Sequence, residues 1–130
     1  MDDETFLAAL EDATLDAADF THRAHVRAGF LILREAHTFG AALDRIERAI
    51  RGFAAKNGKD GLYHATITTA FMALIHARMA LHPERGWEAF AAANPDLFEA
   101  DVLTRYYPRD VLAEPAARAA FQLPPVGEAA

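Results

Sequence analysis

Apolar side chains recur at intervals of three and four residues through the first two-thirds of the chain. The clearest stripe runs between charged residues and consists of Phe39, Leu43, Ile46, Ile50 and Phe53. This spacing places apolar side chains on one face of an α-helix. The same rhythm predicts helices over about residues 3–13, 21–36, 41–56, 62–81 and 84–93.

One segment allows a second interpretation. Residues 66–69 are all β-branched, which would suit the start of a strand. However, the helical spacing of Tyr63, Ile67, Phe71 and Leu74 extends over a stretch longer than a typical strand, so a helix is favoured.

Prolines divide the last third of the chain into shorter pieces. The sequence therefore predicts an all-α fold, an irregular up-and-down bundle of four to five main helices followed by short C-terminal helical pieces. We expect one domain over residues 1–123 and a flexible tail over residues 124–130.

The composition limits the kinds of functional site that the chain can form. The chain has 130 residues, of which 52% are hydrophobic, enough for one domain with a buried core. It contains no cysteine, which excludes disulfides, a catalytic thiol and thiolate metal sites. A metal site in this chain would consist of nitrogen and oxygen ligands.

Net charge and hydropathy indicate which classes of partner the protein does not bind. The net charge of −6 argues against binding to duplex nucleic acid, which usually requires a basic face. The apolar runs are too short to cross a membrane, and the acidic start Met1-Asp2-Asp3-Glu4 lacks the basic region of a signal peptide. We therefore expect a cytoplasmic protein that binds neither nucleic acid nor membranes.

The short loops predict how the central helices are arranged. Helices joined by short connections pack as antiparallel neighbours. The connections near Gly40 and at residues 57–61 are both short. The helices over residues 21–36 and 62–81 should therefore run parallel, with their first turns side by side.

Those first turns carry three of the six histidines. His22 and His25 are three residues apart and so lie on one helix face, while His64 lies at the start of the later helix. The positive end of a helix dipole disfavours imidazolium, and neutral imidazole is the form that binds metals. We therefore predict that His22, His25 and His64 hold a divalent transition metal, namely zinc, iron, nickel or copper.

Other polar side chains could complete this site. Asp19, Glu99 and Asp101 are candidates for a fourth ligand or for a carboxylate that orients an imidazole. Tyr63, Thr66 and Thr68 are candidate catalytic residues because their hydroxyl groups could bind a substrate.

Two short motifs resemble a known family. Residues 20–26 (FTHRAHV) and 61–68 (GLYHATIT) are similar to the paired F-x-H-x-x-H and Y-H-E-T-x-T motifs of a largely uncharacterised family of small bacterial helical proteins. The resemblance implies a shared site at the histidines, with Tyr63, Thr66 and Thr68 beside them. This chain has Ala65 where the family motif has glutamate, so binding without turnover, or a different chemistry, is an alternative.

The leading interpretation is a metal-binding protein, and more specifically a metal-dependent enzyme that acts on a small polar molecule. The sequence does not distinguish a hydrolase, a lyase and an oxygenase. One alternative is a metal-free module that binds a small molecule or an anion. Another is a structural or interaction protein, and the oligomeric state is left open.

Overall fold

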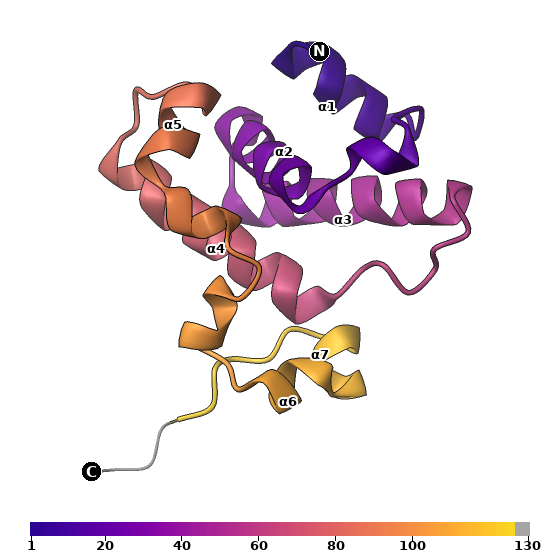
Figure 1. Ribbon diagram of the computed structural model, residues 1–130, viewed down its shortest axis with the longest axis vertical. Helices are drawn as coiled ribbons and strands as arrows, with labels where there is room; N and C mark the ends of the chain where they lie inside the picture. Colours follow the sequence, from indigo (N-terminus) through magenta and orange to yellow (C-terminus); the bar gives the residue numbers. More distant parts are fainter. Residues whose placement is uncertain (127–130) are drawn as a thin grey trace.

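A computed structural model describes residues 1–126, and every regular element among them is helical (Figure 1). The main helices are α1 (Asp3–Glu11), α2 (His22–Glu35), α3 (Phe39–Lys56), α4 (Ala65–Leu81) and α5 (Trp87–Ala93). The shorter pieces are η1 (Ala17–Asp19), η2 (Pro95–Phe98), η3 (Val102–Arg105), α6 (Arg109–Ala113) and α7 (Pro115–Ala119). The predicted all-α fold is confirmed. Of the tail expected at 124–130, residues 127–130 lie outside the described part.

Side-chain caps set where the long helices begin. Asp2, Thr21, Thr38 and His64 each accept a hydrogen bond from the backbone N–H three residues further on. The cap at Thr38 starts α3 two residues earlier than expected. The cap at His64 starts α4 three residues later than expected.

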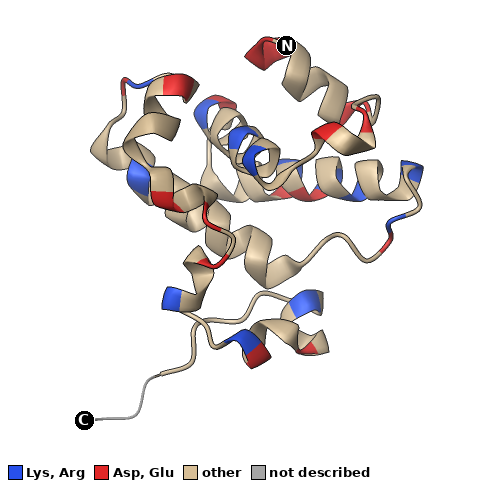
Figure 2. Ribbon diagram, in the orientation of Figure 1, with Lys and Arg blue, Asp and Glu red and all other residues tan. Residues whose placement is uncertain are grey.

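Helix α4 lies between the N-terminal helices and the C-terminal pieces α6 and α7 (Figure 1). Its buried residues are Ala65, Thr66, Met72 and Ile75, and most of the others are also apolar. Arg78 is its only residue among Asp, Glu, Lys and Arg, so the helix is nearly free of charge colouring in Figure 2. No helix within residues 1–126 has the length and apolar character needed to cross a bilayer.

Helices α2 and α4 approach each other closely at Gly29. A Cβ atom at Gly29 would lie 3.0 Å from Ile75 Cδ1 and 3.0 Å from Met72 Sδ. One end of this contact is formed by His22, the first residue of α2, whose ring packs edge-on against Phe71 with centroids 5.2 Å apart. Phe71 lies in the second turn of α4, so the first turn of α4 extends beyond the start of α2.

We expect alanine to have opposite effects at two glycines. In α3, Gly52→Ala meets nothing within 4 Å and should raise the free energy of unfolding by about 0.5–1 kcal/mol through helix propensity. In α2, Gly29→Ala gains the same propensity but crowds Met72 and Ile75, at a cost of about 1–3 kcal/mol. In urea denaturation, the free energy of unfolding of Gly29→Ala should be about 1–3 kcal/mol lower than that of Gly52→Ala. Equal stability of the two variants would contradict the close approach.

Candidate functional site

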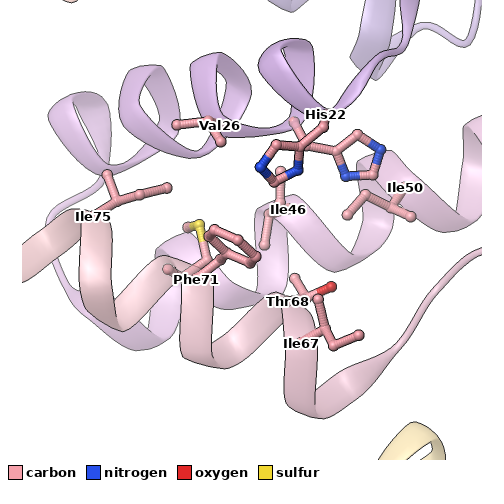
Figure 3. A pocket seen from close by; sticks show the side chains of 10 residues that line it. His22, Val26, Ile46, Ile50, Ile67, Thr68, Phe71 and Ile75 are labelled. Carbon is pink, nitrogen blue, oxygen red and sulfur yellow. The ribbon is translucent and has the colours of Figure 1, made fainter. Parts of the chain in front are cut away.

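A small pocket lies where α2, α3 and α4 meet (Figure 3). Its volume is about 70 Å³. Its polar side chains are His22, His25 and Thr68. The rest of the lining is apolar and consists of Val26, Ile46, Ile50, Ile67, Phe71, Met72 and Ile75.

The structure brings His22, His25 and Thr68 to one pocket. His22 and His25 lie on one face of α2, and that face continues inward through the buried residues Val26 and Gly29. Figure 3 shows the His22 ring reaching from α2 toward Phe71 and Thr68 on α4. The two imidazoles therefore lie at the polar end of a face that is otherwise part of the core.

One hydrogen bond defines which ring nitrogen of neutral His22 carries the proton. Its Nε2 atom lies 2.9 Å from the backbone oxygen of Leu97 in η2. A carbonyl oxygen can only accept, so Nε2 carries the proton and donates it. In neutral His22 the Nδ1 atom is consequently the hydrogen-bond acceptor.

His25 is held by stacking. Its ring lies against the Phe20 ring, with centroids 3.8 Å apart and an interplanar angle of 18°. Within residues 1–126 neither of its ring nitrogens forms a hydrogen bond with another protein group. Burial, and to a lesser degree the neighbouring His22, lowers the pKa of His25 to about 4. The imidazole is therefore neutral at physiological pH.

His64 does not join this pocket. It lies seven residues before Phe71, which corresponds to about 10 Å along the axis of α4. Its Nδ1 accepts a hydrogen bond from Ile67 N–H at 3.1 Å, and its Nε2 donates to the backbone oxygen of Leu112 at 2.8 Å. Both ring nitrogens are thus occupied in capping α4 and in holding α6.

The expected site of three histidines is therefore not assembled. In the described part of the chain, no three side chains among His, Cys, Asp and Glu are placed to hold one metal ion. The expectation was wrong about geometry because it placed the first turns of α2 and α4 side by side, whereas they are offset.

The carboxylates considered as further ligands lie elsewhere. Asp19 is exposed and lines a separate, open groove beside Trp87. Glu99 lies 3.8 Å from Arg105, and Asp101 lies 3.9 Å from Arg109, all at the surface. None of these carboxylates lines the pocket of His22 and His25.

Tyr63 and Thr66 form structural contacts away from the pocket. The Tyr63 hydroxyl donates to Glu47 at 3.3 Å, and the Arg51 guanidinium lies 4.5 Å from the centre of its ring. The buried Thr66 hydroxyl donates to Ala117 O at 2.7 Å and accepts from Gln122 N–H at 3.1 Å. Of the three hydroxyl residues singled out from the sequence, Thr68 is the one that lines the pocket.

Sequence reasoning missed two contributors. Phe20 precedes His22 in the first motif, and its role as the stacking partner of His25 has a sequence signal in that motif. The Leu97 carbonyl has none, because any residue supplies a backbone oxygen and its position depends on the fold of η2.

The result is a small apolar pocket with two adjacent imidazoles and one hydroxyl group. Comparisons of the chain with protein-family models, with curated proteins and with solved structures find no match.

We expect the neutral state of His25 to contribute to stability at neutral pH. Its pKa is about 4 in the folded protein and about 6.5 in the unfolded chain, so acid protonates the unfolded state first. The contribution is complete above pH 6.5 and is lost as the pH falls toward 4. Between pH 7 and 4.5 the free energy of unfolding of the wild type should fall by about 2 kcal/mol more than that of His25→Phe.

Denaturation of both proteins at the two pH values measures this difference, and NMR titration of the His25 Cε1–H resonance measures the pKa directly. Phenylalanine keeps a ring against Phe20, which limits the packing change. A His25 pKa near 6.5 would show that the imidazole is not desolvated.

Proposed function

We propose that the pocket of His22 and His25 binds a small, uncharged molecule that donates a hydrogen bond. The observation that carries this proposal is the placement of a neutral, desolvated His25 among apolar walls. No Lys, Arg, Asp or Glu lines the pocket, so an ionic ligand would lose its hydration without gaining a counter-charge. The pocket thus favours a neutral ligand over an anion.

The size of the pocket limits the ligand. An apolar cavity of about 150 Å³ holds benzene, and this pocket has about half that volume, 70 Å³. A ligand enclosed by it has about three or four non-hydrogen atoms. The best small ligands gain at most about 1.5 kcal/mol per such atom, so three atoms give a Kd of about 0.5 mM at the tightest.

The polar groups define the orientation of the ligand. His22 donates its Nε2 proton to the Leu97 carbonyl, so its Nδ1 atom is an acceptor. The Thr68 hydroxyl can donate or accept. A ligand O–H or N–H directed at the imidazoles would leave its apolar part against Phe71 and the isoleucines.

A second candidate is a divalent metal bound by His22 and His25. The observation that favours it is the bond from His22 to Leu97, because metal-binding histidines commonly donate their other N–H to a carbonyl group. Neutral His25 is also in the form that binds a metal. With two protein ligands, the remaining positions would be filled by water or by a substrate, as a metal-dependent enzyme requires.

Four probes of three non-hydrogen atoms each test the ligand class. We expect ethanol and formamide, which donate hydrogen bonds, to shift the His22 and His25 Cε1–H resonances saturably with a Kd of about 1 mM or weaker. Acetonitrile lacks a strong donor and formate is charged, so both should bind at least about fivefold more weakly.

His25→Phe should weaken binding of formamide at least about fivefold, because it removes an imidazole and keeps the ring. His76→Phe is the matched control, since His76 lies outside the pocket and packs against Phe39. Saturable binding of formate as tight as that of formamide, or no saturable shift with any probe, would refute the proposal.

Calorimetric titration with Zn²⁺ at pH 7 tests the second candidate. The metal site of His22 and His25 predicts one ion per chain, bound weakly because only two imidazoles, three residues apart, supply ligands. Binding should disappear in His25→Phe, persist in His76→Phe and fall in acid, where protons compete for the nitrogens. Equal Zn²⁺ binding by His25→Phe and the wild type would place the ion elsewhere and reject this candidate.

A further inference from the structure

The single charged residue of α4 makes a clamp on η2. Arg78 donates to both carboxylate oxygens of Asp96, at 2.9 and 2.7 Å, and to the side-chain oxygen of Asn94 at 2.9 Å. Arg105 adds a third hydrogen bond to Asp96 at 3.0 Å. These guanidinium contacts, chiefly that of Arg78, lower the pKa of Asp96 to about 2. The carboxylate therefore stays charged throughout the neutral and mildly acidic range.

The clamp is adjacent in sequence to the group that fixes His22. Asp96 and Leu97 are consecutive residues of η2, and the Leu97 side chain is fully buried. The Leu97 carbonyl accepts the bond from His22 Nε2 at 2.9 Å. Asn94, which is also buried, donates to Phe90 O at 2.9 Å and so ties the start of η2 to α5.

We propose that Arg78 is a positioning residue for the pocket. By holding Asp96 it places the Leu97 carbonyl against His22, and this carbonyl keeps the imidazole proton on Nε2. The acceptor at Nδ1 is thus set by a residue that does not line the pocket. Its importance for ligand binding rests on the proposed function, whereas its effect on the His22 proton does not.

The physical reason is the freedom of an unpartnered imidazole. The hydrogen bond made by one ring nitrogen decides which nitrogen carries the proton. When the carbonyl is displaced, the proton exchanges between Nδ1 and Nε2 and the ring can rotate. A fraction of the molecules would then present a donor where a donating ligand needs an acceptor.

The experiment compares the two ring nitrogens of His22 by ¹⁵N NMR above the histidine titration range. In the wild type we expect two well-separated shifts, with the protonated nitrogen assigned to Nε2. In Arg78→Gln and in Asp96→Asn the two shifts should move toward each other, and the Kd for formamide should rise at least about threefold. Arg78→Lys keeps the positive charge but loses the bidentate contact with Asp96, so the two nitrogen shifts should lie between those of the wild type and Arg78→Gln.

Arg51→Gln is the matched control, because it breaks the exposed ion pair with Glu47 on α3 and should leave the His22 shifts unchanged. Circular dichroism establishes whether each variant is folded. If Arg78→Gln does not fold, the test uses Asp96→Asn. Wild-type His22 shifts in a folded Asp96→Asn variant would overturn the positioning role. Failure of every probe to bind the wild type would instead refute the proposed function, while the nitrogen shifts still decide the role of Arg78.

Discussion

The close contact between α2 and α4 sets how His22 of α2 lies relative to Phe71 and Thr68 of α4. It depends on Gly29, whose missing Cβ lets Met72 and Ile75 approach the backbone of α2. This contact places His22 beside Phe71 and leaves the first turn of α4 beyond the start of α2. The pocket of His22 and His25 forms at the edge of the contact, where α3 closes its remaining side.

The hydrophobic spacing was sufficient to predict the all-α fold and most helix positions, because a period of 3.6 residues records which face is buried. Short loops also indicated that α2 and α4 are neighbours. Loop length does not determine how far one helix slides along another, since that depends on side-chain packing such as the contact at Gly29. The expected meeting of His64 with His22 failed at this step.

Helix geometry explains why Thr66 and Thr68 contact different parts of the protein. Two residues correspond to a rotation of about 200°, so Thr66 and Thr68 point to nearly opposite sides of the helix. Thr68 lines the pocket, and Thr66 holds Ala117 and Gln122 of the C-terminal segment. A motif read as one site in the sequence thus serves two surfaces. Its first part, with His64, attaches α6 to the start of α4 through the Leu112 carbonyl.

Position 65 connects this geometry to the neutral character of the pocket. Ala65 lies three residues before Thr68 and therefore on the same side of α4 as the pocket-lining hydroxyl. A carboxylate on that side of α4 would favour imidazolium at nearby histidines. Alanine brings no such charge, and burial then keeps His25 neutral. The uncharged residue at position 65 is thus consistent with the proposed pocket for an uncharged ligand.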